Sequence, residues 1–237
     1  MRILTIVILC LSTLALPAKA AGPVMHVMLG ERWLAKYAPN YTAEEKRIFL
    51  LGTVFPDIRY LGVIDKNKTH FKSVTLQNVY QGNSPFKRGM LFHSYVDDFR
   101  NKIVLQSGLN KNLQAIPSRY RGTFLKLVED QILHEQAPRE AFIQTLSEIP
   151  EDEKQFNIPP KSLMQWHTGL TLYFSTLPST ILMQLGLFDK PILSLDASTV
   201  KTWGILLPEY VQQDVFRNHV KKTLSSFDRA FETYKPK

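Results

Sequence analysis

Apolar residues recur along most of the chain at the three- and four-residue spacing of amphipathic helices. The clearest stripes are formed by Met25, Met28, Leu29 and Trp33, and by Val220, Leu224, Phe227 and Phe231. No segment shows the sustained alternation of apolar and polar residues that is typical of a half-buried strand. The pattern therefore predicts an all-α fold, a multi-helix bundle of roughly six to eight helices.

Several of the expected helices begin or end at recognisable signals. Thr42 and the two glutamates that follow it predict a capped helix start, and this helix is expected to end before Pro56. Between helices we expect a long loop over 57–71 and a charged connector over 151–160. The other predicted helices span 24–38, 84–100, 118–136, 138–149 and 208–234, with two further helices inside 163–195 separated near Pro178.

The first 20 residues have the pattern of a signal peptide. Arg2 is followed by an apolar run over 3–16, and the segment ends in the small-x-small sequence Ala18-Lys19-Ala20. We expect cleavage after Ala20 and export of the mature chain to the periplasm or the medium. The only cysteine, Cys10, would leave with this segment, so the mature chain would have no disulfide and no thiolate ligand.

Residues 21–237 contain no clear linker or repeat, so we expect a single helical domain. Loss of Arg2 and Lys19 would lower the formal net charge from +8 to +6. A basic surface favours anionic partners such as phospholipid head groups, nucleic acid or acidic glycans, although generic surface charge is the more ordinary explanation. No segment of the mature sequence has the unbroken apolar length of a transmembrane helix.

The stretch Gly89–Asp98 carries the strongest chemical signal. It places His93 and Asp97 four residues apart, so on a helix both side chains lie on one face. An imidazole nitrogen and a carboxylate that converge in this way suit a divalent cation. The surrounding residues are mostly apolar, and a buried carboxylate needs a partner or a metal. The simpler alternative is a core histidine hydrogen-bonded to the neighbouring aspartate.

Other metal-capable residues occur before and after this helix. His26 lies on the first expected mature helix, and Asp57 and His70 stand at the two ends of the expected loop. Long loops inside compact domains are often functional. Asp130 and His134 form another pair four residues apart, and four of the six histidines fall in this collection.

The order of these residues resembles the bacterial zinc-dependent phospholipase C family, and more distantly the S1/P1-type nucleases that share its helical fold. The resemblance covers about residues 24–135 and implies a phospholipase C/P1 nuclease-like bundle. It rests on an early helical His26, then Phe49-x-x-Gly52-x-x-x-Pro56-Asp57, then Thr69-His70-Phe71, then Gly89-x-x-x-His93-x-x-x-Asp97.

The chain also departs from the family pattern. The family has a further histidine shortly after the helical aspartate, and residues 100–105 contain none. The family's later His-x-x-x-acid pair is replaced at best by Asp130-x-x-x-His134, in reversed order. In the family the mature N-terminal residue lies at the metal site, whereas Ala21 precedes His26 by only five residues. We therefore expect one or two zinc ions in place of three.

The resemblance also implies ligands and chemistry. His93, His70 and Asp57 would hold the first zinc ion, and His26, Asp97 and His134 would complete it or hold a neighbour. Asp57 or Asp97 would be the catalytic carboxylate that bridges metals or orients the water. A metal-bound hydroxide would then attack the phosphorus of a diester.

These features predict a secreted zinc-dependent hydrolase of the phospholipase C type, with phospholipid as its substrate and peripheral contact with a membrane surface. Two alternatives remain open: an S1/P1-type nuclease, for which Tyr60, Phe71 and Tyr95 offer stacking surfaces, and a non-catalytic metal-binding protein of the same fold. Arg59, Lys66 and Lys68 lie between two expected ligands and are candidates to bind phosphate, or simply residues of a solvated loop.

Overall fold

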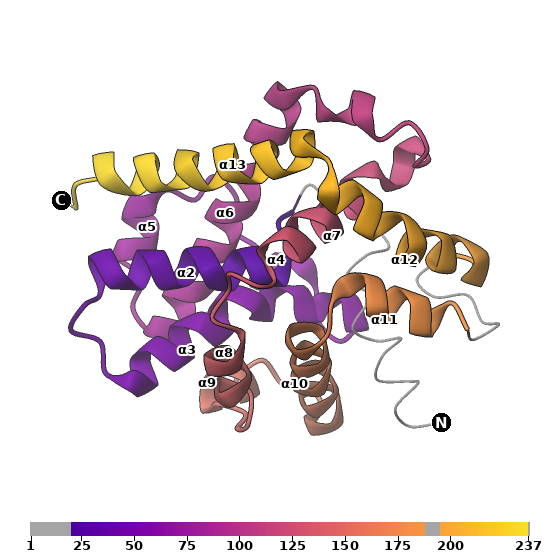
Figure 1. Cartoon of the computed structure of the whole chain (residues 1–237). Coiled ribbons are helices and arrows are strands. Elements are labelled where there is room, and N and C mark those ends of the chain that lie inside the picture. The colour runs from indigo at the N-terminus through magenta and orange to yellow at the C-terminus, as the bar shows by residue number, and fades with distance from the viewer. Residues whose placement is uncertain (1–19, 188–194, 237) are drawn as a thin grey trace.

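Helices make up the regular structure of the chain in the computed structural model, which describes residues 20–187 and 195–236 (Figure 1). Twelve α-helices and three short 3₁₀-helices are present in these two ranges. The all-α prediction is therefore confirmed. The helices outnumber the predicted six to eight because several of them have only one or two turns. The predicted signal peptide lies outside the described residues, apart from Ala20.

The helices differ widely in length, from single turns to the 23 residues of α6. In chain order they are α2 (Pro23–Tyr37), α3 (Ala43–Val54), η2 (Phe55–Leu61), α4 (Lys66–Thr69), α5 (Leu76–Tyr80), α6 (Pro85–Ser107), η3 (Leu109–Asn112), η4 (Ser118–Tyr120), α7 (Arg121–Leu133), α8 (Arg139–Thr145), α9 (Glu151–Lys154), α10 (Pro160–Ser175), α11 (Pro178–Leu185), α12 (Ala197–Gln212) and α13 (Asp214–Thr233).

Local sequence signals explain several of the helix ends. Thr42 and Glu45 form a reciprocal capping box at the start of α3, as the sequence predicts. Pro178 opens α11, where the sequence predicts a break between two helices. Ser84 caps α6 by accepting a hydrogen bond from the backbone N–H of Lys87.

Three predictions of local structure are wrong. Residues 57–71 are not one long loop, because Pro56 fits the first turn of η2 and Asp65 caps the short helix α4. The expected connector over 151–160 contains α9. The expected helix over 208–234 is two helices: Pro208 lies inside α12, and the chain breaks at Gln213, which has an extended backbone.

Two glycines allow α3 and α6 to pack at very short range. A Cβ atom added to Gly89 would lie 2.2 Å from the carbonyl oxygen of Phe49, and one added to Gly52 would lie 2.4 Å from that of Phe86. Any larger residue would push the two helices apart. The pair therefore fixes the distance between α6 and the end of α3, from which η2 continues.

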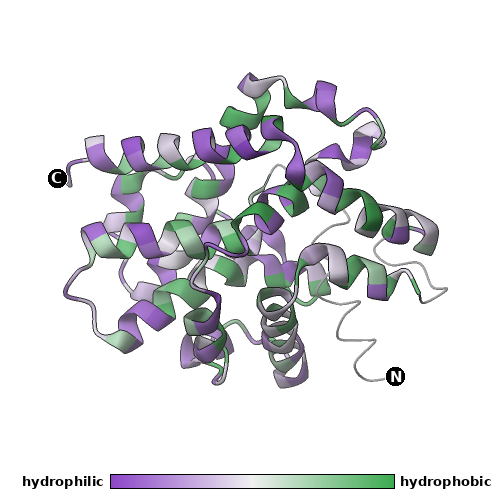
Figure 2. Ribbon diagram, viewed as in Figure 1, coloured by the Kyte–Doolittle hydropathy of each residue, from purple (hydrophilic) through white to green (hydrophobic). Residues whose placement is uncertain are grey.

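Helix α2 lies centrally and packs against α3, α6, α7 and α13 (Figure 1). Apolar residues gather on the helix sides that face neighbouring helices, and α13 carries polar residues on its outer side (Figure 2). This arrangement buries the middle of the bundle, where α2, η2 and α6 approach one another.

None of the helices in the described ranges combines the length and apolar character needed to cross a lipid bilayer.

Candidate metal centre

Five of the six predicted ligands come together where α2, η2, α4 and α6 meet. They form two groups that could hold a metal ion, and within each group one ligand atom per residue lies within 4.8 Å of the others. One group is His26, His93 and Asp97, and the other is Asp57, His70 and His93. His93 belongs to both groups, so it is the residue on which the whole cluster depends.

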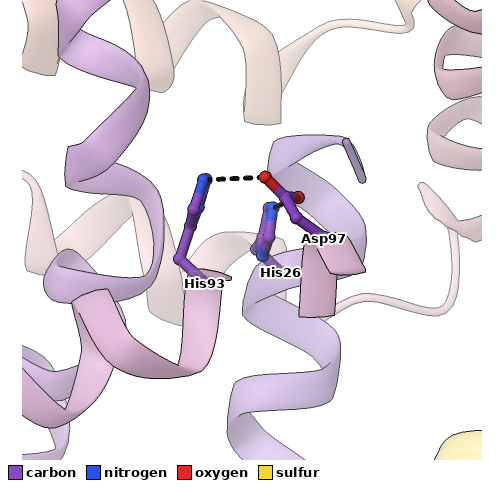
Figure 3. A group of neighbouring side chains, drawn as sticks. All are labelled: His26, His93 and Asp97. Carbon is purple, nitrogen blue, oxygen red and sulfur yellow. Dashed lines mark ion pairs between the residues drawn. The ribbon is translucent and has the colours of Figure 1, made fainter. Parts of the chain in front are cut away.

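The first group joins α2 to α6 (Figure 3). The Nε2 atom of His93 lies 3.2 Å from Oδ2 of Asp97, and Nε2 of His26 lies 3.1 Å from Oδ1. The two imidazole rings stack with their centroids 4.1 Å apart. Both ring nitrogens of His26 are buried: among the described residues Nδ1 has no hydrogen-bond partner, and Nε2 has only the ion-pair contact with Asp97, which lacks hydrogen-bond geometry. Buried ring nitrogens that lack a hydrogen bond are suited to bind a metal ion.

The second group adds the ends of two short helices. Asp57 lies in the first turn of η2, and His70 directly follows α4. The Nε2 atoms of His70 and His93 are 3.3 Å apart, and Oδ1 of Asp57 is 4.0 Å from Nε2 of His93. This carboxylate oxygen is also buried without a hydrogen-bond partner among the described residues.

Neighbouring groups orient two of the imidazoles. Nδ1 of His93 is 2.8 Å from the carbonyl oxygen of Thr53 and donates a hydrogen bond to it, so Nε2 is left to bind a metal. Nδ1 of His70 is 3.1 Å from the hydroxyl of Thr69. Such outer contacts are the usual means of holding histidine ligands in place.

The three histidines of the cluster differ in pKa because their electrostatic environments differ. Burial lowers the pKa of His26 to about 4 and that of His70 to about 3, and the nearby His93 contributes to both shifts. Burial also lowers the pKa of His93, but Asp97 and Asp57 outweigh it and raise the pKa above its ordinary value. His26 and His70 are therefore neutral, as metal ligands must be, whereas a proton competes with a metal at His93.

Both carboxylates of the cluster are ionised. Burial raises the pKa of Asp57, but the positive charges of Lys126 and His93 outweigh it, and the pKa lies below its ordinary value. The pKa of Asp97 is held well below its ordinary range because His93 and His26 outweigh burial. Three imidazoles and two carboxylates thus make a donor set that can hold a divalent metal ion.

The start of α2 is tied to this cluster. The backbone N–H of Ala21 donates to Oδ1 of Asp97 over 2.9 Å, so the chain does reach the site five residues before His26. Asp130 anchors the same segment by accepting hydrogen bonds from the backbone N–H groups of Val24 and Met25. These contacts hold α2, and with it His26, against α6 and α7.

His134 does not join either group in the described part of the protein, contrary to the predicted ligand set. Its side chain instead interacts with backbone groups of Tyr173 and Thr176. Asp130 is directed to the start of α2 and accepts a hydrogen bond from the hydroxyl of Tyr173. Asp130 lies on α7 and His134 comes directly after its end, and contacts with α2 and with the end of α10 give the two residues separate structural roles.

A cavity of about 670 Å³ opens beside the cluster. His70 and Asp97 lie in its wall, together with three basic residues and a second acidic one: Arg59, Lys66, Lys72 and Asp98. Arg59 stacks on the ring of Tyr60 at 3.9 Å and lies 3.6 Å from Asp57. Lys68, predicted from sequence as a phosphate contact, is not among the lining residues.

The remaining two histidines have carboxylate partners of their own. Nε2 of His167 is 2.8 Å from Glu153, as expected of a satisfied core histidine, and Nε2 of His219 is 2.9 Å from Glu129. Sequence reasoning missed Lys126, which lies beside Asp57, and the anchoring role of Asp130. The sequence signal for both was a group of three charged residues, Lys126, Glu129 and Asp130, in a helical segment that is otherwise mostly apolar.

Comparison of the chain with models of known protein families, with curated proteins and with solved structures finds no match. The resemblance to the zinc-dependent phospholipase C family therefore rests on the order of the motifs alone and stays a prediction.

Proposed function

We propose that the protein is an exported zinc-dependent phosphodiesterase of the phospholipase C type, with phospholipid as its favoured substrate. One observation carries the proposal: two metal-capable groups share His93 and, through His70 and Asp97, reach a cavity whose wall also contains Arg59, Lys66 and Lys72. A substrate that enters this cavity would meet the proposed metal ligands and positive side chains together.

Zinc is the metal that this set of ligands favours. Imidazole nitrogen and carboxylate oxygen are common zinc ligands, and no cysteine competes for the role in the mature sequence. Bound zinc would supply a water acidified toward neutral pH and a positive charge to polarise a phosphoryl oxygen. The ring nitrogens of His26 and the Oδ1 atom of Asp57, which are buried without a hydrogen bond among the described residues, support one or two ions.

The chain's own residues divide the remaining work. Asp97 contacts both His26 and His93 and also borders the cavity, so it is the better placed carboxylate to accept a proton from an attacking water. Asp57 is enclosed by cationic groups and acts mainly as a ligand. Arg59, held by Tyr60, would bind a nonbridging phosphate oxygen.

Export would complete the site in the same region. Cleavage after Ala20 would turn the backbone nitrogen of Ala21 into a free amine at its present position, 2.9 Å from Asp97. The start of the mature chain would then contribute a further nitrogen to the metal centre, as the family resemblance implies.

A nuclease is the second candidate, and one observation favours it. Tyr60 and Phe71 line the same cavity and could stack on bases, whereas Tyr95 stacks on Phe99 and is not among the lining residues. The basic residues in the wall suit the phosphates of either substrate.

The test compares phosphatidylcholine vesicles, single-stranded nucleic acid and a chromogenic diester, each with and without a chelator. We expect chelator-sensitive hydrolysis of the lipid that returns when zinc is added back. Hydrolysis of nucleic acid alone would replace the proposal with the nuclease. Full metal occupancy without hydrolysis of any diester would identify a non-catalytic metal-binding protein.

A further inference from the structure

Lys126 is the most unusual charged residue of the described part of the chain. It lies in the middle of α7 with its side chain fully buried. Its Nζ atom has no hydrogen-bond partner among the described residues. A buried ammonium without such a partner is costly and requires compensation by a nearby negative charge.

The ion-pair partner is Asp57, and the buried carboxylate of Asp130, one turn further along α7, also interacts with the charge of Lys126. Nζ of Lys126 lies 3.7 Å from Oδ2 of Asp57, the carboxylate oxygen that does not take part in the contact with His93. On the other side, Oδ1 of Asp57 lies within 4.0 Å of His93 and 3.6 Å from Arg59. Asp57 therefore presents one oxygen to the metal-capable group and the other to a lysine.

We propose that Lys126 is a built-in cation that stands in for a metal at Asp57. Its ammonium neutralises the buried carboxylate before a metal binds, so that the cluster stays formed in the metal-free protein. The ammonium also pairs with Oδ2 of Asp57, so that only Oδ1, on the side of His70 and His93, is left to bind a metal. Lys126 is thus a positioning residue that acts through Asp57.

A thermodynamic consequence follows from the like charges of Lys126 and the metal. Both cations stabilise the same carboxylate, so each reduces the benefit of the other, and their coupling is unfavourable. Removing the lysine charge must destabilise the metal-free protein more than the zinc-loaded protein. By the same cycle, zinc must bind more tightly to the variant. If Lys126 only filled space in the core, neither the unequal loss of stability nor the tighter zinc binding would be expected.

The test is Lys126→Met, which keeps an unbranched side chain only one atom shorter and removes the charge. We expect the midpoint of thermal unfolding to fall by roughly 10 °C in the presence of a chelator, as for a broken buried ion pair in a domain of this size. With zinc bound it should fall by less than half as much. Zinc affinity, measured by competition with a chromogenic chelator, should rise about tenfold or more.

Three further variants keep the test decisive if Lys126→Met folds poorly. Lys126→Arg retains the charge and should keep zinc affinity close to that of the wild type. In an Asp57→Asn background, Lys126→Met should cost the metal-free protein much less stability, because its partner is already neutral. Lys87→Met is the matched control, because Lys87 is half-buried over the ring of Phe71 and makes no contact with Asp57; its zinc affinity should be unchanged.

Equal losses of stability with and without zinc would overturn the inference, as would unchanged or weaker zinc binding in Lys126→Met. The inference rests on the metal binding proposed above, so a wild-type protein that binds no zinc would overturn it as well. Its readouts are stability and affinity and do not require diester hydrolysis. An inactive protein that still binds zinc would therefore count against the proposed reaction and leave the role of Lys126 intact.

Discussion

Replacing His93 by alanine removes the residue that both metal-capable groups share. Its Nε2 atom lies 3.2 Å from Asp97, 3.3 Å from Nε2 of His70 and 4.0 Å from Asp57. Without this imidazole each group has only two of its three ligands. We therefore expect His93→Ala to lose all stoichiometric zinc.

The size of the effect has two parts. The fully buried imidazole stacks on His26 and donates to the carbonyl oxygen of Thr53, and losing a buried polar partner costs about 1–3 kcal/mol. Zinc present at a hundred times its dissociation constant stabilises the wild type by about 2.7 kcal/mol, which the variant forfeits. The free energy of unfolding should therefore fall by roughly 4–6 kcal/mol with zinc and about 1–3 kcal/mol with a chelator.

Denaturant unfolding with and without a chelator measures both parts, and elemental analysis gives the zinc content. His219→Ala is the matched control, because His219 is also a buried histidine paired with a carboxylate but lies outside both groups. It should lose stability equally in the two conditions and keep its zinc. Equal loss of zinc from both variants, or full zinc retention in His93→Ala, would refute the placement of the site.

Three further outcomes follow from the geometry. Asp57→Asn should lower the turnover of a diester much more than it lowers binding to lipid vesicles, because the side chain is buried among the proposed ligands and Lys126. Steady-state kinetics measures the turnover, and vesicle sedimentation measures the binding. Zinc affinity should fall by up to about tenfold per pH unit as the pH drops below the pKa of His93, because a proton then competes with zinc for Nε2. Burial lowers this pKa, but Asp97 and Asp57 outweigh burial and raise it above its ordinary value of 6.5. Competition with a chelator at several pH values measures the change in affinity. Gly89→Ala should cost about 1–3 kcal/mol in denaturant unfolding, because the new methyl group would lie 2.2 Å from the carbonyl oxygen of Phe49.

The sequence predicts the helices best where packing and capping agree. The start of α3 follows from Thr42 and Glu45, whose side chains form the predicted box within the segment itself. The division at the end of the chain could not be predicted in this way. Helical periodicity continues across Gln213, and Pro208 is accommodated inside α12 instead of starting a new helix. Such choices depend on contacts between α12 and other helices, which no local pattern contains.

The candidate site also has a part that local sequence predicts and a part that depends on packing between helices. His93 and Asp97 are paired by helical spacing, so their convergence is a local property that the sequence reveals. The place of Asp57 and His70 beside them depends on the close packing of α3 and α6 at Gly52 and Gly89. The spacing of Asp130 and His134 is also helical, yet only packing decides that these two residues do not converge on the cluster.

The contact between Ala21 and Asp97 shows the limit of counting residues. Five residues separate Ala21 from His26, and by that count alone the start of the mature chain falls short of the cluster. In the structure this interval is the start of α2 and the residues just before it, and Asp130 holds that segment against α7. The distance along the chain is therefore a poor guide to the distance in space.

The central claim is that this cluster is a zinc centre that hydrolyses phosphate diesters. Its most direct test is the rate of phosphatidylcholine hydrolysis by the chelator-treated protein as zinc is returned, measured against the zinc that is bound. We predict no hydrolysis without metal and a rate that rises with occupancy until one or two equivalents are bound. Hydrolysis that persists without metal would contradict the claim, as would full zinc occupancy with no hydrolysis of phosphatidylcholine or of any other diester.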